Sequence, residues 1–405
     1  MKELKGYSSS YKPLEILYIA NGNGLNPNLG GSFVRTVEIA KRLSVKESVN
    51  FITTIGGFQA ARREGVNANF RVLPASFLKK VETHAFDRIL SYVICTFWFI
   101  LVVHKIARCD IVYTDSDSFC DVIPAVLYKK IAKSKWLPMS HHRIRLEVRS
   151  PSAFMATLLE YANQSFSFTM FKRYADRVLI YKTPAGDEIK ETLIRLGLSK
   201  DKIVPVCNGV DIKMISSIKV REKVYEACLV GGLRPGKGLY EVIPIWKEVV
   251  RSKPDAKLVV VGEMLSHYRS YLKAQADKQK IEANLELLGG CSHRAALEII
   301  KKSKVLISPS TVEGWGIAIY EALASGVPVI AYALSSFIDI PSDTFIRVKK
   351  GDSPSFAKAV LECLSIDNLR TRLIQNGMSF VKEYDWNLIA EKELSLMQKL
   401  MNSNG

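Results

Sequence analysis

Residues 305–331 read VLISPSTVEGWGIAIYEALASGVPVIA, and this stretch decides the fold class of the chain. Residues 305–307 form a short apolar run that ends at Pro309, as a buried parallel strand does where it enters a loop. A helix-length segment follows, and residues 327–331 begin a second apolar run after Gly326. This order of strand, loop, helix and strand predicts a βαβ unit of a parallel sheet.

The loop within this unit predicts a site for a phosphate and a sugar. Gly314 and Gly316 let the backbone approach a ligand closely, and the helix expected from Ile317 turns its free N–H groups toward the same point. Glu321 lies in that helix, where its two carboxylate oxygens suit the vicinal hydroxyls of a sugar. Glu313 precedes it in the loop. An ordinary βαβ unit with two exposed glutamates is the alternative, because such a pair alone is a weak signal.

Composition indicates a globular intracellular chain. Its 405 residues suit two or three domains, and 48% hydrophobic residues are enough for two cores. Seven cysteines without C-x-x-C spacing argue against disulfides and structural zinc. The apolar run 16–20 is too short for a signal-peptide core. We expect a cytoplasmic protein, with peripheral attachment to the inner face of the membrane left open.

The net charge of +17 is concentrated in the first half of the chain. Residues 1–200 contain 29 Lys and Arg against 17 Asp and Glu, whereas residues 201–405 contain 28 against 23. This bias suggests an anionic partner such as a membrane surface, although a solvated surface also explains it. The longest uncharged run, residues 89–103, is shorter than the roughly 20 residues of a spanning helix. A buried core helix and an interfacial helix both fit this run.

Apolar strand-like runs alternate with helix-length segments in both halves of the chain. The first half contains ILYIA, FITTI, FRVLP, DIVYT, WLPMS and RVLIY, and the second contains IVPV, ACLVG, LVVVG, LELLG, VLISPS and VPVIA. This rhythm predicts two doubly wound parallel-sheet domains, 1–200 and 201–380, with ligands bound beyond the carboxyl ends of the strands in a cleft. A final helix is expected within 381–405, with Asp385 as its N-cap.

Residues 305–331 closely resemble the E-x7-E signature of retaining glycosyltransferases of family 4, also called glycosyl transferases group 1. The resemblance implies the GT-B fold, in which two Rossmann-like domains face a cleft. It implies an acceptor-side domain, a nucleotide-sugar domain, and a C-terminal helix that crosses back to the first domain, with Trp386 as a packing anchor. Glu321 would hold the donor ribose and Glu313 the donor sugar, and the donor loop would comprise Gly314, Trp315, Gly316 and Ile317.

Further motifs of the second half support the same resemblance. The turn in ACLVGGLRPGKGLYEVI presents Arg234 and Lys237, which would stabilise a diphosphate leaving group without a metal. Relatives often have an arginine where this chain has Gly232, so the cationic role passes to Arg234 or rests on Lys237. An exposed basic turn is the alternative. The resemblance also places Asn208, Gly289 and Gly290 in the donor site, the two glycines contacting the base.

In the first half, the resemblance points to a double glycine and a histidine pair. Gly30 and Gly31 precede a helix and resemble the donor-phosphate loop, where Arg35 would add charge. His141 and His142 follow the strand WLPMS, and the first is expected to hydrogen-bond the donor sugar. Because successive side chains of an extended chain alternate, the second would be structural or contact the acceptor.

A competing motif, Asp115-Ser116-Asp117, has the spacing of the D-x-D motif that holds a metal in GT-A transferases. GT-A enzymes have a single nucleotide-binding domain and lack the motifs of the second half. We therefore expect no metal and no cofactor, and an acceptor-side or N-cap role for these carboxylates.

Together these patterns predict a retaining, metal-independent glycosyltransferase. It would move a hexose from a UDP- or GDP-sugar to a glycan or lipid-linked acceptor, and the resemblance implies that the leaving phosphate oxygen takes the acceptor proton. Residues 129–149 contain seven Lys and Arg against Glu147 alone, which favours an anionic or lipid-linked acceptor. Two alternatives remain: a nucleotide-sugar 2-epimerase of the same fold, and a basic membrane- or nucleic-acid-binding module. No nucleic-acid partner is expected, because no recognisable binding motif is present.

Overall fold

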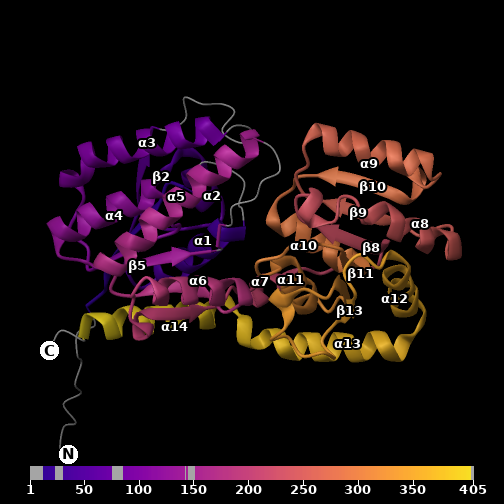
Figure 1. Ribbon diagram of the computed structural model, residues 1–405. Helices are drawn as coiled ribbons and strands as arrows, with labels where there is room; N and C mark the ends of the chain where they lie inside the picture. The colour runs from indigo at the N-terminus through magenta and orange to yellow at the C-terminus, as the bar shows by residue number, and fades with distance from the viewer. Residues whose placement is uncertain (1–11, 23–30, 75–84, 142, 145–150, 403–405) are drawn as a thin grey trace, which may run out of the picture. The chain divides into compact units, whose positions relative to one another are not determined.

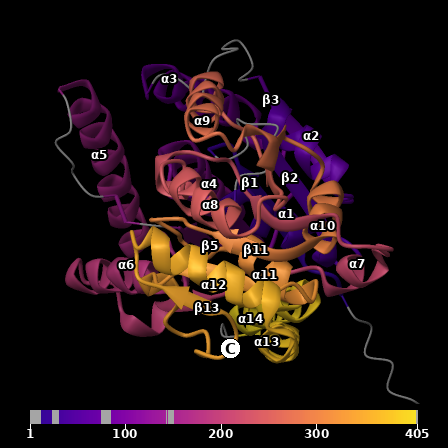
Figure 2. The ribbon, with the colours of Figure 1, turned by 90° about the vertical axis from the view of Figure 1, so that its right-hand side faces the viewer.

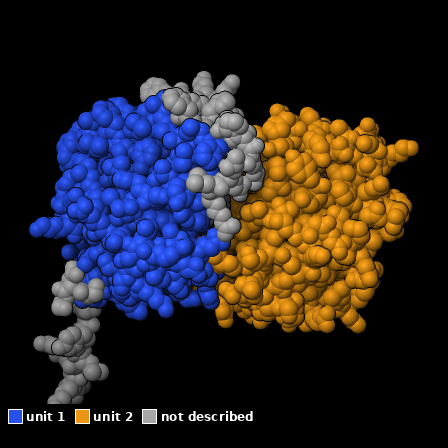
Figure 3. Space-filling view, in the orientation of Figure 1, with its two compact units in different colours: residues 1–182, 186–206, 390–405 blue, residues 183–185, 207–389 orange. Residues whose placement is uncertain are grey.

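The computed structural model describes residues 12–22, 31–74, 85–141, 143–144 and 151–402, and it divides into two units (Figures 1 and 3). Unit 1 comprises residues 1–182, 186–206 and 390–405, and unit 2 comprises residues 183–185 and 207–389. The sequence placed the domain boundary near residue 200, and the units divide after Val206. Each unit contains its own parallel sheet.

The sheet of unit 1 has seven strands in the order β3-β2-β1-β4-β5-β6-β7. Every neighbouring pair is parallel. The order reverses between β1 and β4, and such a switch point is where doubly wound sheets bind ligands. The strands are β1 (Glu15–Ala20), β2 (Ser48–Thr54), β3 (Asn69–Leu73), β4 (Ile111–Thr114), β5 (Lys135–Ser140), β6 (Val178–Tyr181) and β7 (Ile203–Val206).

Helices cover both faces of this sheet (Figures 1 and 2). On one face, α3, α4 and α5 pack into a core that includes Cys95, Tyr128 and Phe171. On the other face lie α1 and α2, as right-handed crossovers in the opposite direction along the sheet require. The helices of unit 1 are α1 (Gly31–Leu43), α2 (Ile55–Arg63), α3 (Ala85–Val102), α4 (Phe119–Ala132), α5 (Pro151–Tyr174) and α6 (Pro184–Arg195).

The sheet of unit 2 has six parallel strands in the order β10-β9-β8-β11-β12-β13. Its core includes the fully buried Trp246 of α8 and Phe356 of α12. The strands are β8 (Tyr225–Val230), β9 (Leu258–Val261), β10 (Leu285–Gly289), β11 (Ser303–Ser308), β12 (Val329–Tyr332) and β13 (Ile346–Val348). The helices are α7 (Ile212–Ser217), α8 (Val242–Ser252), α9 (Ser266–Lys278), α10 (His293–Lys302), α11 (Ile317–Ala324), α12 (Ser353–Ser365) and α13 (Asp367–Phe380).

The last helix, α14 (Trp386–Asn402), starts in unit 2 and continues in unit 1 from Ala390. Trp386 is buried and packs against Gly209, where an added Cβ would lie 2.9 Å from the Trp386 ring. Within unit 1, the buried Glu393 forms an ion pair with Arg35 of α1. The structure therefore corrects the expectation that Arg35 adds charge to a phosphate loop: its guanidinium is fully buried and anchors α14.

Candidate active site

Glycines line the carboxyl ends of three neighbouring strands of unit 2. Gly231, Gly262 and Gly289 have φ values of 134°, 137° and 81°, which side chains rarely adopt. Gly231 N donates to Val261 O and Gly262 N donates to Gly289 O, each at 2.8 Å. A Cβ on Gly262 would lie 2.3 Å from Gly231 O. The three strand ends thus approach more closely than any other residue type would permit.

Lys237 and Glu313, which come from separate sequence motifs, form an ion pair with 2.5 Å between Nζ and Oε1. The two loops are held together because Gly236 O accepts from the backbone N–H groups of Thr311 and Val312 at 3.1 and 3.2 Å. Ser310 Oγ also donates to Glu313 Oε1 at 3.1 Å. The structure therefore places a cation and a carboxylate, both predicted as donor ligands, side by side in one unit.

Arg234 lies on the same turn as Lys237. Its Nη1 would be 3.9 Å from a Cβ at Gly232, the position where relatives of the predicted family often have arginine. A Cβ there would also lie 3.0 Å from Glu263 O, so the turn leaves little room for a side chain at residue 232. This geometry is consistent with a transfer of the cationic role from residue 232 to Arg234.

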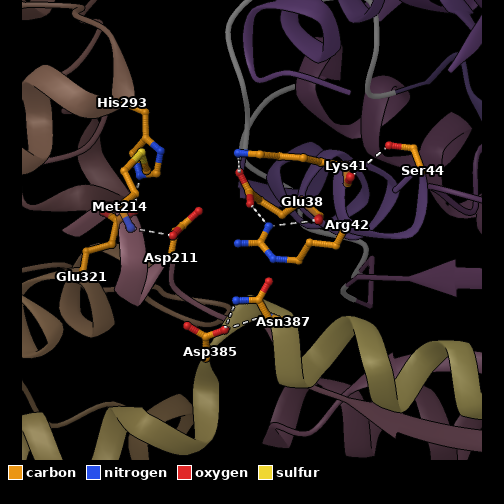
Figure 4. Close-up of polar contacts among 10 residues, drawn as sticks. All are labelled: Glu38, Lys41, Arg42, Ser44, Asp211, Met214, His293, Glu321, Asp385 and Asn387. Atoms are coloured by element: carbon orange, nitrogen blue, oxygen red, sulfur yellow. Dashed lines mark hydrogen bonds and ion pairs between the residues drawn. The ribbon is translucent and has the colours of Figure 1, made fainter. Parts of the chain in front are cut away.

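Glu321 is buried in α11, and its Oε1 lies 2.6 Å from Nε2 of His293 (Figure 4). His293 is the first residue of α10, whose N-cap Ser292 accepts from Ala295 N at 3.3 Å. We did not predict His293 from the sequence. Its place directly after the Gly289–Ser292 loop was the available signal, because that loop was already expected to lie at the donor site.

The loop that leads into α11 combines an open and a packed glycine. Gly316 is the N-cap of α11 with a φ of 83°, and a Cβ there would lie 3.0 Å from Phe337 Cε1. A Cβ on Gly314 would meet no atom within 4 Å. Gly314 therefore faces open space, which leaves its backbone accessible to a ligand, as does the start of α11 at Ile317.

Trp315 belongs to an aromatic cluster of unit 2. Its ring is 7% exposed, stacks on Tyr320 at 5.3 Å and lies 6.0 Å from Tyr384. Because the indole packs inside the unit, a contact between Trp315 and a donor would be made by its backbone. The structure thus narrows the predicted role of this residue.

Asn208 is buried at the end of the turn that leads into α7. Its Oδ1 has no hydrogen-bond partner among the residues that the structure describes. The turn itself is fixed, because a Cβ on Gly209 would lie 2.7 Å from Tyr384 O, and Asp211 Oδ1 accepts from Met214 N at 2.8 Å (Figure 4). Buried acceptors are normally satisfied, so this oxygen is suited to a ligand donor.

In unit 1, both ring nitrogens of His141 are bound to protein groups. Nε2 lies 2.5 Å from Asp115 O and Nδ1 lies 3.2 Å from Tyr181 Oη. A carbonyl oxygen only accepts, so Nε2 carries the proton and Nδ1 accepts from the tyrosine. This corrects the expectation that His141 binds a donor hydroxyl, since its nitrogens serve the fold. His142 and Gly30 lie outside the described residues, and Gly31 is the first residue of α1.

The two carboxylates of the D-x-D sequence bind different groups. Asp115 Oδ1 accepts from Thr36 Oγ1. Asp117 Oδ2 accepts from Ser140 Oγ at 2.7 Å and from Gln164 Nε2 at 2.9 Å. Within the described part of the chain, no group of three or more His, Cys, Asp or Glu residues is placed to hold a metal ion. These aspartates therefore join strand ends to neighbouring helices, which is neither of the roles we expected.

Asp121 of α4 is a second residue that we did not predict. It is fully buried at the switch point, where its Oδ1 accepts from Asn21 N at 2.7 Å and its Oδ2 from Ser116 Oγ at 2.5 Å. Burial raises the pKa of Asp121 to about 8, although hydrogen bonds from Ser116 and Asn21 oppose the shift. Asp121 thus connects the carboxyl ends of β1 and β4.

The family model described as glycosyl transferases group 1 matches residues 211–380. These residues form a group 1 glycosyl transferase domain. The match covers the part of the chain that carries Lys237, Glu313 and Glu321, and it confirms the predicted family.

Relatives of this domain carry the names of glycosyltransferases. One of them, from Arabidopsis thaliana, is named as part of phosphatidylinositol N-acetylglucosaminyltransferase and is 26% identical over 209 residues, which are 50% of this chain and 45% of that protein. Phosphatidyl-myo-inositol mannosyltransferase of Mycobacterium leprae is 26% identical over 208 residues, 49% of this chain and 54% of that protein. The chain thus spans about half the length of these curated relatives.

Solved structures extend the likeness beyond the group 1 domain to nearly the whole chain. HepE of Anabaena, solved in complex with UDP and glucose, has a TM-score of 0.71 at 16% identity, over 95% of this chain and 100% of that one. A glycosyltransferase of Rickettsia africae has a TM-score of 0.70 at 19% identity, over 98% and 100%. At these identities the likeness shows the fold alone, and the predicted GT-B fold is confirmed.

Proposed function

We propose that the protein transfers a hexose from a UDP- or GDP-sugar to a glycan or lipid-linked acceptor, with retention of configuration and without a metal. The observation that carries the proposal is the ion pair of Lys237 with Glu313, in the same glycosyl transferase domain as the pair of His293 with Glu321. One pair supplies a cation for a diphosphate, and the other supplies a buried carboxylate for sugar hydroxyls.

Each residue has one task in this mechanism. The Glu321 carboxylate accepts hydrogen bonds from the ribose, and Glu313 accepts from the donor sugar. Lys237 and Arg234 stabilise the charge that develops on the diphosphate as the glycosidic bond breaks. The departing phosphate oxygen takes the acceptor proton on the same face of the sugar. No side-chain base and no metal are then needed.

The acceptor is proposed to be lipid-linked and presented at a membrane surface on the cytoplasmic side. Two relatives are named for transfer to phosphatidylinositol or phosphatidyl-myo-inositol. The basic segment 129–149 would favour such an anionic acceptor. In the described part of the chain, no helix has the length and apolar character needed to cross a membrane.

A panel of UDP- and GDP-sugars in a thermal-shift assay tests the donor, and turnover of the stabilising donor tests the residues. Lys237→Ala and Glu313→Ala should each lower kcat/KM by at least about a hundredfold, the usual scale for losing an electrostatic stabiliser. Lys304→Ala is the matched control, because it breaks the exposed pair with Glu226 elsewhere in unit 2. Turnover by Lys237→Ala and Glu313→Ala at the wild-type rate would refute the assignment.

Two further measurements separate this reaction from its rivals. NMR of the product should show the anomeric configuration of the donor, and EDTA should leave turnover unchanged. Incubation with UDP-GlcNAc alone should leave the sugar intact, whereas its 2-epimer would identify a nucleotide-sugar epimerase instead.

A further inference from the structure

Helix α3 exposes an unusually apolar surface on unit 1. The run from Ile89 to Val103 has no charged residue. Its inward side chains Cys95 and Phe99 are fully buried in the core of the unit. Its outward side chains are large and apolar, with exposed fractions of 38% for Leu90, 50% for Val93, 58% for Phe97, 38% for Trp98, 47% for Ile100 and 46% for Leu101.

A second apolar stripe follows α5 on the same face of the sheet (Figure 2). Met155, Leu159 and Phe166 are 54%, 44% and 40% exposed, and their spacing of four and seven residues places them on one side of the helix. Glu160 is the only acidic residue of α5. Between these two helices, α4 exposes Ile131. Water thus contacts apolar side chains across the whole helical layer formed by α3, α4 and α5.

Basic residues gather at one edge of this layer. The three helices run in the same direction, because each returns from the carboxyl ends of parallel strands to their amino ends. Their final turns and the residues just beyond therefore meet at one edge. Exposed cations there are Lys105 and Arg108 after α3, Lys130 and Lys133 at the end of α4, and Lys172 and Arg173 at the end of α5. Asp176 also lies at this edge and pairs with Lys129 and Lys135.

We infer that the α3–α4–α5 layer docks on an anionic lipid surface, with the α3 side chains in the acyl boundary and the basic edge on the headgroups. An apolar face with aromatic side chains beside basic residues is the pattern of an interfacial helix. The excess of cations over carboxylates at the edge selects a negatively charged surface. This inference deepens the proposed function, because such a surface is where a lipid-linked acceptor is presented.

Vesicle co-sedimentation of the full chain tests the inference. The wild type should bind phosphatidylcholine vesicles that contain phosphatidylglycerol and bind pure phosphatidylcholine vesicles far more weakly. The α3 variant Phe97→Ser/Trp98→Ser/Leu101→Ser should bind at least about tenfold less, because each exposed side chain loses apolar burial. Lys105→Gln and Lys130→Gln should each weaken binding about fivefold, the fold-change that roughly 1 kcal/mol per basic residue gives.

A matched control alters three exposed apolar side chains elsewhere. Val45→Ser/Ile338→Ser/Ile366→Ser changes residues that are 79%, 73% and 47% exposed and should retain wild-type binding. Equal binding by the α3 variant, or equal binding to both kinds of vesicle, would overturn the inference. So would a wild-type dimer that the α3 variant dissociates and that binds no vesicle, since a second copy would then cover the layer. The thermal shift with the donor sugar should persist in the α3 variant. Loss of donor binding in every protein with vesicle binding intact would refute the proposed function alone.

Discussion

His293 Nε2 lies 2.6 Å from Glu321 Oε1, so the carboxylate proposed to hold the ribose is itself held by a side chain of the neighbouring helix. The two residues are 28 positions apart and start or lie within α10 and α11, whose strand β11 runs between them. A buried carboxylate with a fixed partner has one orientation, which lowers the entropy lost when a donor binds.

Removal of the imidazole should weaken donor binding. We expect His293→Ala to raise the donor Kd about tenfold, the scale of one charge-assisted hydrogen bond, and to change kcat little. His293→Gln should restore part of the affinity, because its amide can donate to the same carboxylate. Calorimetric titration with the donor measures both, and His267→Ala on exposed α9 serves as the control. A wild-type Kd for His293→Ala would show that Glu321 needs no such support.

Asp121 should make the stability of the protein fall as the pH rises. Burial raises its folded-state pKa to about 8 from an ordinary value of 3.8, so the folded state binds the proton more tightly than the unfolded state. The free energy of unfolding should therefore be highest below pH 4 for this group and decline between about pH 4 and pH 8. Urea unfolding at several pH values should show this slope in the wild type. In Asp121→Asn it should be reduced, because the amide has no charge to bury; an unchanged slope would assign it to other groups.

The sequence predicted the architecture well because its signals are local. Apolar runs such as ILYIA and LVVVG are buried on both faces of a parallel sheet, and they appear as β1 and β9. Glycines followed the same logic: Gly231, Gly289 and Gly316 all have positive φ values that only a turn or a helix cap requires. The order of these motifs was enough to find the donor half of the fold.

Side-chain partners were harder to predict, because they depend on contacts between distant segments. Arg35 looked like a phosphate ligand from its position near Gly31, yet its partner Glu393 lies 358 residues away in α14. His141 looked like a sugar ligand, yet both its nitrogens bind groups of other strand ends. Asp121 and His293 were missed for the same reason. A single sequence does not show which polar groups meet in the folded chain.

The Arg35–Glu393 pair should be important for stability. Burial alone would lower the pKa of Arg35, but the Glu393 carboxylate outweighs this and raises it, so the guanidinium stays charged. Arg35→Ala would leave Glu393 buried without its cation, and we expect a loss of about 3–5 kcal/mol. Arg35→Leu/Glu393→Leu should lose less, because no buried charge remains. Urea unfolding measures both, with the exposed pair in Lys358→Ala as a control that costs under about 1 kcal/mol. Equal losses for Arg35→Ala and the control would contradict this role.

The glycine at residue 262 should be irreplaceable in the donor site. Its φ of 137° strains any side chain, and its Cβ would meet Gly231 O at 2.3 Å, so Gly262→Ala must push β8 and β9 apart. We expect a loss of stability above about 3 kcal/mol together with loss of donor binding. Gly65→Ala separates the two causes, because Gly65 has a φ of 87° but no atom within 4 Å of an added Cβ. It should cost only about 1 kcal/mol and leave donor binding unchanged. Comparable melting temperatures for the two variants would show that the strand ends yield, and the close approach of Gly231 and Gly262 would then not be required for the site.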